Sequence, residues 1–122
     1  MQIEQLEVHE DERGILVEAF KFPKDGQVFS VIANPNETRG NHYHTRKIEE
    51  FLVIYGSATI EARDRETGHK MKVEVSGTNP LRVKIMPNHT HAITASSQGA
   101  VFIVWANEIF DKKDPDTFGE EL

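Results

Sequence analysis

The sequence predicts an all-β protein built as a single domain. Short runs rich in Val, Ile, Phe and Thr recur between turn-forming residues, which is the pattern of half-buried strands. Convincing helical periodicity is absent, at least until the tail. A chain of 122 residues is long enough for one hydrophobic core and short for two. We therefore expect one domain that spans residues 1–122.

Each expected strand follows from its local pattern. Charged and apolar residues alternate in 71–75 and 81–85, so one face of these strands should meet solvent. Residues 51–55 and 101–105 are apolar throughout, so they should be covered on both faces, by the barrel interior and by another sheet or subunit. A homodimer is therefore expected. The expected strands are 15–20, 27–33, 50–55, 57–63, 70–76, 81–86, 92–95 and 100–106.

Turns are expected where Gly, Asn, Asp and Pro gather, because these residues suit the dihedral angles of tight turns. The expected turns are 11–14, 24–26, 34–36, 56, 65–68, 77–80, 87–88 and 96–99. From about residue 111 onward the chain should form an irregular acidic tail that packs only in part.

Charge and composition exclude several classes of function. The formal net charge is -6, and no Lys/Arg cluster offers the basic stripe that a nucleic-acid groove needs. Without cysteine there is neither a disulfide frame nor thiolate chemistry. The chain begins without an apolar signal core, and no run approaches the roughly 20 apolar residues of a membrane span. A cytoplasmic protein without nucleic-acid or membrane partners is expected.

Histidines and a glutamate occur at the spacing of a metal site. His42 and His44 occupy alternate positions, which point the same way in an extended chain. Glu49 and, from a neighbouring strand, His91 could then close around one ion. Imidazole nitrogen and carboxylate oxygen suit zinc, iron, manganese and nickel. Glu50 is the alternative to Glu49, because neighbours along a strand face opposite ways and only one can point inward.

This spacing resembles the two motifs of the cupin family. The matching positions are Asn36, His42, His44, Glu49 and Gly56 in the first motif, and Pro87, Asn88, Thr90 and His91 in the second. In cupins, two histidines, a glutamate and a later histidine hold a divalent metal inside a small jelly-roll barrel, or double-stranded β-helix. The resemblance implies that His42, His44, Glu49 and His91 are the ligands, for Zn²⁺ first and for Mn²⁺, Fe²⁺ or Ni²⁺ as alternatives. Asn36 and Asn88 replace family glycines, and Asn is the residue that best tolerates a left-handed backbone after Gly.

Further stretches are similar to one group of cupins. They are 38–44, 51–60, 105–111 and 115–118. They resemble the C-terminal cupin domain of bifunctional capsular-polysaccharide enzymes that make UDP-N-acetyl-L-fucosamine precursors. There, a zinc cupin epimerises a UDP-linked 4-keto-6-deoxy sugar beside its ketone, and a separate dehydrogenase domain reduces the product. More distantly, residues 11–14 resemble the opening of dTDP-keto-sugar epimerases and ketoisomerases.

The resemblance implies a metal-dependent epimerase or isomerase of a nucleotide-linked 4-keto-6-deoxy sugar in surface-polysaccharide synthesis. The likeness includes no reductase domain, and no Gly-rich phosphate loop occurs in the sequence, so a separate reductase is an expected partner. Removing the C–H proton beside a ketone needs a group with a pKa near neutrality. The candidates are His89, Tyr55 and Lys47, with His89 first. Tyr43 should face away from the metal, because it alternates with the ligand histidines.

Three side chains are candidates for binding the sugar nucleotide. Arg39 could pair with a diphosphate through its planar guanidinium, or lie solvated in a turn. Trp105 could supply a flat wall for a sugar or base, or fill the core or a dimer interface. Asn107 could bond the ligand, or cap the end of a strand.

Two other functions fit the same residues. Three histidines and a glutamate also hold iron in related barrels, which predicts a non-haem iron dioxygenase. The chain could instead be a non-catalytic sugar-binding partner of a separate reductase.

Overall fold

Strands form the whole regular architecture of the computed structural model, which describes residues 1–20 and 25–122. No helix occurs in these residues, and the all-β prediction is confirmed. The strands are β1 (Gln2–Gln5), β2 (Val8–Asp11), β3 (Gly14–Val17), β4 (Gln27–Ala33), β5 (Thr38–Tyr43), β6 (Glu49–Asp64), β7 (Lys70–Ser76), β8 (Leu81–Ile85), β9 (His89–Ala106) and β10 (Phe118–Gly119). Within the described ranges, the chain offers no helix of the length and apolar character that crossing a membrane requires.

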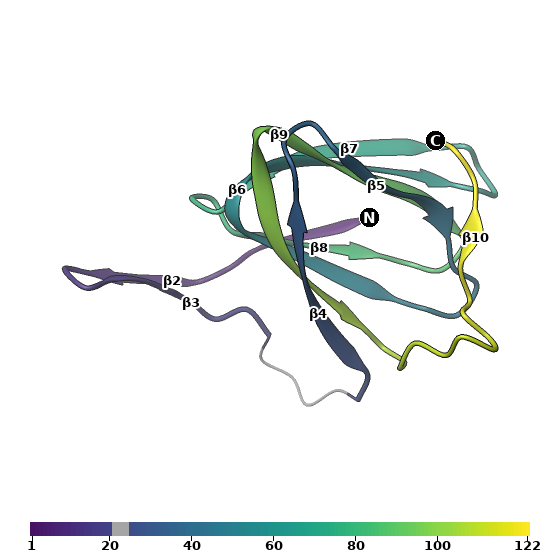
Figure 1. Cartoon of the computed structure of the whole chain (residues 1–122), viewed down its shortest axis with the longest axis horizontal. Helices are drawn as coiled ribbons and strands as arrows, with labels where there is room; N and C mark the ends of the chain where they lie inside the picture. Colours follow the sequence, from purple (N-terminus) through teal and green to yellow (C-terminus); the bar gives the residue numbers. More distant parts are fainter. Residues whose placement is uncertain (21–24) are drawn as a thin grey trace.

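Two long strands, β6 and β9, carry the fold. They pair with each other along nearly their whole lengths, from Glu49 opposite Ala106 to Asp64 opposite His89. The first part of β6 also pairs with β8, and its later part with β7. In the same way, the first part of β9 pairs with β5 and the later part with β4. Figure 1 shows β6 and β9 curving around the barrel, with β10 across one end and the β2–β3 hairpin projecting away from the barrel on the side opposite β10.

The continuity of β6 and β9 corrects the prediction of four shorter strands separated by turns at residue 56 and at residues 96–99. The register shifts between Val53 and Tyr55 and between Gly56 and Ala58, so β6 bends at bulges without leaving the sheet. Gly56 has φ +73°, and a Cβ there would lie 2.2 Å from the backbone oxygen of Gly99. Glycine therefore permits a close crossing of two paired strands here, not a turn.

The other predicted elements fall into three groups. The strands at 27–33 and 70–76 are confirmed residue for residue, and the strand at 81–86 is one residue shorter. The expected strand at 15–20 is β3, which ends at Val17. Of the turn at 24–26, residue 24 lies outside the described residues. Four strands were missed, because β1, β2, β5 and β10 are short or polar and depend on pairing partners that are distant in sequence.

The predicted asparagine turns are confirmed. Asn36 and Asn88 adopt φ of 63° and 61°, the left-handed conformation expected of residues that replace glycine. The turn at Asn88 brings the chain from β8 into β9, three residues before His91.

The core lies inside the barrel and follows strand alternation. Phe51 and Val53 point inward from β6, and Phe102 and Val104 point inward from β9. Glu49 has the same parity as Phe51, so the sheet aims its carboxylate at the interior. A charged side chain thus lies next to the apolar residues of the barrel interior.

Candidate metal centre

Four side chains converge at one end of the barrel. His42 lies in β5, His44 directly follows that strand, Glu49 begins β6 and His91 lies in β9. One potential ligand atom from each lies within 4.8 Å of all the others. The ring of His42 is 4.8 Å from that of His91 and 4.9 Å from that of His44. These are the four residues that the resemblance implied as ligands, and the fold brings them together.

A single oxygen of Glu49 joins two of the histidines. Its Oε1 lies 2.9 Å from Nε2 of His44 and 3.1 Å from Nε2 of His91. Glu50 is also buried, but it has the opposite parity and pairs across the sheet with Trp105. Strand alternation therefore places Glu49, and not Glu50, against the histidines.

The other ring nitrogen of each of these two histidines meets a backbone carbonyl. Nδ1 of His44 lies 2.6 Å from the carbonyl oxygen of Asp116, and Nδ1 of His91 lies 3.0 Å from that of His89. A carbonyl oxygen only accepts hydrogen bonds, so both Nδ1 atoms carry a proton and donate. This leaves both Nε2 atoms directed at a common centre, the arrangement that metal-binding histidines usually show. The donor set and its orientation fit a divalent transition metal such as zinc.

Burial and mutual contacts shift the pKa values of the cluster in different directions. Burial alone would raise the pKa of Glu49, but the hydrogen bonds from His44 and His91 outweigh it and hold that pKa well below its usual range. Burial lowers the pKa of His44, yet the contact with Glu49 outweighs it and the net pKa is raised. Burial, with the nearby His91 and His44, lowers the pKa of His42 to about 4. His42 is therefore neutral at pH 7, the state in which imidazole binds metals.

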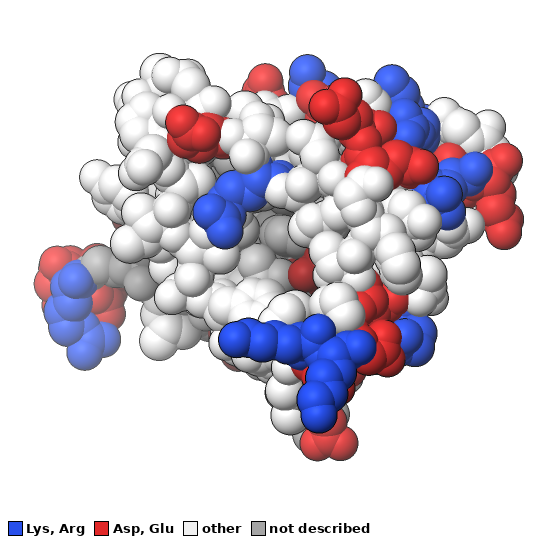
Figure 2. Space-filling view, turned by 45° about the vertical axis from the view of Figure 1, so that its right-hand side comes forward, with Lys and Arg blue, Asp and Glu red and all other residues white. Residues whose placement is uncertain are grey.

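A cavity of about 540 Å³ opens beside the cluster, a volume typical of sites for small molecules. Its titratable lining residues, among those described, are Arg39, His42, Glu49 and His91. Aromatic side chains from three strands, Phe29, Phe51 and Phe102, supply much of the apolar wall. The face of the molecule in Figure 2 is hollowed near its centre, and Lys and Arg side chains around the hollow are interspersed with Asp and Glu.

The three predicted proton-transfer residues lie elsewhere. His89 turns back on the preceding turn, with Nδ1 2.9 Å from the Pro87 carbonyl oxygen and Nε2 3.8 Å from Asp64. Tyr55 is 72% exposed, because it falls at a bulge of β6 on the outside of the barrel. Lys47 is buried, but its Nζ donates to the carbonyl oxygen of Pro115 at 2.8 Å. The structure does not bring these side chains to the cavity.

Of the three predicted substrate-binding residues, one lies at the cavity and two do not. Arg39 lines the cavity. Trp105 is buried and follows the cavity-lining Val104, so it points to the opposite face of β9. Asn107 accepts a hydrogen bond from the backbone N–H of Ile48 at 3.0 Å, as in the alternative in which it caps the end of a strand. Arg39 is therefore the predicted substrate-binding residue that lies at the cavity.

Tyr43 faces away from the cluster, as strand alternation predicted. Its ring stacks on Phe118 at 5.3 Å, and the guanidinium of Arg65 lies 3.7 Å from the ring centroid.

Sequence reasoning missed Asp116 and the aromatic wall of the cavity. The signal for Phe51 was present, because it shares the inward parity of Glu49. For Asp116 the signal was the resemblance of residues 115–118 to one group of cupins, but residue chemistry gave none, because an acidic residue in an irregular tail is ordinarily solvated. Its side chain is nevertheless buried, with 2% of the residue exposed.

Known proteins resemble this chain over most of its length. Residues 9–118 match a family described as the polysaccharide biosynthesis C-terminal domain. A relative from Pseudomonas aeruginosa, a UDP-2-acetamido-2,6-beta-L-arabino-hexul-4-ose reductase, is 40% identical over 112 residues. That match covers 91% of this chain and 30% of the relative.

Solved structures show the same fold. The capsular polysaccharide assembling protein CapF from Staphylococcus aureus superposes with a TM-score of 0.77 at 37% identity, over 98% of this chain and 33% of that one. The dTDP-6-deoxy-D-glucose-3,5-epimerase RmlC from Legionella pneumophila, solved with dTDP-4-keto-L-rhamnose, superposes with a TM-score of 0.83 at 20% identity. That superposition covers 96% of this chain and 70% of the epimerase. The predicted cupin barrel is confirmed. The chain spans about a third of the length of the P. aeruginosa and S. aureus proteins.

Proposed function

Because this chain belongs to the polysaccharide biosynthesis C-terminal domain family, we propose that it is a metal-dependent epimerase of a nucleotide-linked 4-keto-6-deoxy sugar in surface-polysaccharide synthesis. One observation carries the proposal. Three imidazoles and one carboxylate converge beside a cavity large enough for a sugar, and two of the imidazoles are oriented by backbone carbonyls. The relatives support the substrate class, since one is named as a reductase of a UDP-linked hexul-4-ose and another as a dTDP-sugar epimerase.

The residues of the cluster suit this chemistry. His42, His44, Glu49 and His91 would hold the ion, most simply Zn²⁺. When bound, a divalent metal supplies a Lewis acid that polarises the ketone and stabilises the negative charge of an enediolate. Arg39 would orient the substrate by pairing with the diphosphate.

Proton transfer in this proposal depends on the cavity lining. His89, Tyr55 and Lys47 lie outside it, so their sequence-based assignment as proton-transfer groups requires that side chains move on substrate binding. Without such movement, one of the titratable groups that line the cavity, or a bound water, would carry the proton.

Exchange of the substrate proton with solvent tests the proposal directly. Zinc-loaded protein is incubated with a UDP-4-keto-6-deoxy sugar in deuterated water, and deuterium at the carbon beside the ketone is followed by NMR. We expect incorporation with the unmodified protein and none with His91→Ala. His69→Ala is the matched control, because His69 is an exposed histidine outside the cluster. No deuterium with the zinc-loaded unmodified protein would reject the proposal for that sugar.

A second candidate is a non-catalytic sugar-binding partner of a separate reductase. The position of His89, Tyr55 and Lys47 away from the cavity favours it. In that case the UDP-sugar binds without deuterium exchange, and binding persists in His91→Ala. The epimerase proposal requires exchange that His91→Ala abolishes, so the same experiment separates the two.

A homodimer and a cytoplasmic location are part of the proposal. Val28 and Ile32 on the outside of β4 are 60% and 75% exposed, and a second copy would cover such apolar side chains. Analytical ultracentrifugation of the unmodified protein and of a Val28→Ser, Ile32→Ser variant measures whether this face pairs.

A further inference from the structure

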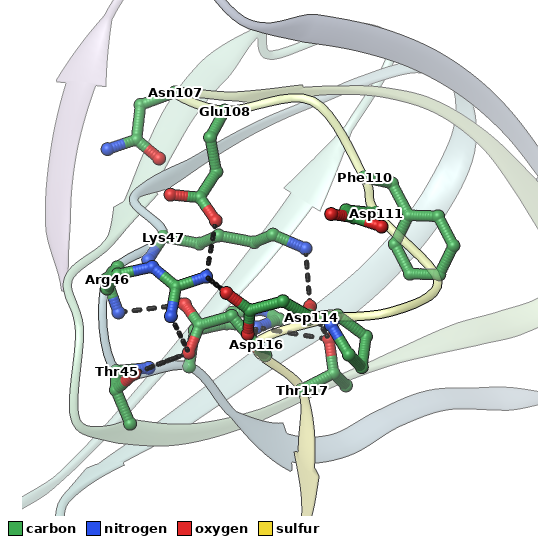
Figure 3. Close-up of polar contacts among 12 residues, drawn as sticks. Thr45, Arg46, Lys47, Asn107, Glu108, Phe110, Asp111, Asp114, Asp116 and Thr117 are labelled. Carbon is green, nitrogen blue, oxygen red and sulfur yellow. Dashed lines mark hydrogen bonds and ion pairs between the residues drawn. The ribbon is translucent and has the colours of Figure 1, made fainter.

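The C-terminal tail crosses the end of the barrel that holds the candidate metal centre. Its short strand β10 pairs with β5, with Phe118 opposite Tyr43 and Gly119 opposite His42. Directly before β10, the tail contacts the loop between β5 and β6, residues 44–48, which connects His44 to Glu49. Figure 3 shows these contacts, with Asp116 between Thr45, Arg46 and Thr117.

The buried carboxylate of Asp116 binds this loop through four hydrogen bonds. It accepts from the backbone N–H groups of Thr45 at 2.9 Å, Arg46 at 2.8 Å and Lys47 at 3.0 Å, and from the Thr45 hydroxyl. An ionised carboxylate is expensive to bury unless such donors replace its water. The side chain is therefore a charged anchor inside the loop.

The backbone of the same residue contacts a candidate ligand. Asp116 has φ +46°, and its carbonyl oxygen accepts the Nδ1–H of His44 at 2.6 Å. Side chain and carbonyl of one residue thus bind four consecutive residues, 44–47. Because the carboxylate is fixed to the loop, the carbonyl is fixed relative to the imidazole.

The surrounding contacts are weaker or more exposed. Arg46 pairs with Glu108 at 3.0 Å and with Asp114 at 3.1 Å, but about half of the Arg46 side chain is exposed. Exposed ion pairs of this kind contribute little. Lys47 adds one bond to the carbonyl oxygen of Pro115. The buried link between tail and loop is centred on Asp116.

We propose that Asp116 is a positioning residue for the metal centre, which keeps His44 in the Nδ1–H tautomer with its Nε2 directed at the metal. The inference rests on the proposed metal site and deepens it, because it makes the tail part of that site. Loss of a partner that orients a ligand histidine typically lowers metal affinity about 10–100-fold. We expect a loss of that size when the Asp116 anchor is removed.

The test compares Asp116→Asn with Asp114→Ala. Asparagine keeps the size of the residue and tolerates positive φ, but it replaces one carboxylate oxygen with an NH₂ group that faces N–H donors. Asp114 is an acidic neighbour in the same tail whose side chain is 66% exposed, so its variant controls for the loss of a charge. Zinc affinity is measured by competition with a chelator. The tautomer of His44 is read from ring ¹⁵N shifts in metal-free protein, at a pH where His44 is neutral.

We expect Asp116→Asn to bind zinc about 10–100-fold more weakly and to lose the preference of His44 for the Nδ1–H tautomer, while Asp114→Ala matches the unmodified protein. Unchanged zinc affinity and an unchanged tautomer in Asp116→Asn would overturn the inference. If that variant does not fold, Thr45→Val, which removes only the hydroxyl bond, is measured in the same way. The tautomer needs neither metal nor substrate, so this result stands whether or not the protein proves to be an epimerase.

Discussion

His44 and His91 meet the same oxygen of Glu49, but the protein orients them by different means. His91 donates to the carbonyl oxygen of His89, two residues earlier in the same strand. His44 donates to the carbonyl oxygen of Asp116, 72 residues further along the chain. The His91 side of the centre, the β9 half, is therefore oriented within its own strand. The His44 side, the tail half, is oriented only when the C-terminal tail docks.

This difference predicts that mutations and local opening disturb the orientation of His44 more easily than that of His91. The β9 half lies in a strand that is paired on both sides, with β5 and with β6. The tail half depends on a mostly exposed segment, and such segments open at lower free energy than paired core strands. Changes that act on Glu49 should disturb both halves, whereas changes to the tail should disturb only His44.

The largest effect is expected for Glu49→Gln, because it removes the group that both histidines share. Zinc affinity measured by chelator competition should fall more than in any variant of the tail, since the site loses its one anionic ligand and keeps three imidazoles. Glu61→Gln is the matched control, because Glu61 lies in the same strand outside the cluster and its side chain is 46% exposed. Retention of tight zinc binding by Glu49→Gln would remove Glu49 from the ligand set.

The pH dependence of zinc binding should come from His44 more than from His42. The pKa of His44 is raised above 6.5, so in metal-free protein His44 keeps its proton into that range and zinc must displace it. Affinity should therefore rise with pH through and above 6.5, and level off once His44 is neutral. His42, with its pKa lowered to about 4, contributes only in more acidic solution. Calorimetry in buffers of different ionisation enthalpy measures the released proton, and no proton release near pH 6.5 would contradict this assignment.

A smaller effect is expected for Thr45→Val, which weakens only the tail half. It removes one hydrogen bond to a buried carboxylate, a contribution of about 1.5–3 kcal/mol to the free energy of unfolding. Urea unfolding measures this loss. In ¹⁵N spectra the ring of His44 should change while that of His91 does not, and equal changes at both rings would argue against two independently supported halves.

The smallest effect on metal binding is expected for His89→Ala. The group that orients His91 is the backbone carbonyl of residue 89, which this substitution leaves in place. Zinc affinity should stay at the level of the unmodified protein. Deuterium exchange in the same variant then tests the predicted catalytic role of the His89 side chain without interference from metal loss.

Local alternation predicted the part of the centre that lies in regular strands. It placed Tyr43 outward and required that only one of Glu49 and Glu50 point inward, while the cupin resemblance selected Glu49. Alternation would also place His89 on the face of His91, but β9 begins at His89 and its side chain bonds the carbonyl oxygen of Pro87 in the preceding turn.

Long-range docking was beyond what the sequence pattern contains. Asp116 is one of several acidic residues in the tail, and Asp111 and Asp114 are exposed while Asp116 is buried. The difference arises because the tail happens to place Asp116 against three N–H groups of a loop about 70 residues earlier. The sequence also predicted turns at Gly56 and at residues 96–99, where the structure has bends within β6 and β9. A glycine occurs both in turns and in bent strands, so its presence does not distinguish the two.

The hydrogen bonds of Glu49 also bear on how an ion would enter. Its oxygen Oε1 lies within 3.1 Å of the two Nε2 atoms that would become donors, so the carboxylate serves as a template that keeps the rings aligned. Metal binding would then replace protons on the histidine Nε2 atoms with a cation and would require little movement of the backbone. Apo and loaded barrels should accordingly be nearly superimposable, with the adjustment confined to a few side-chain torsions.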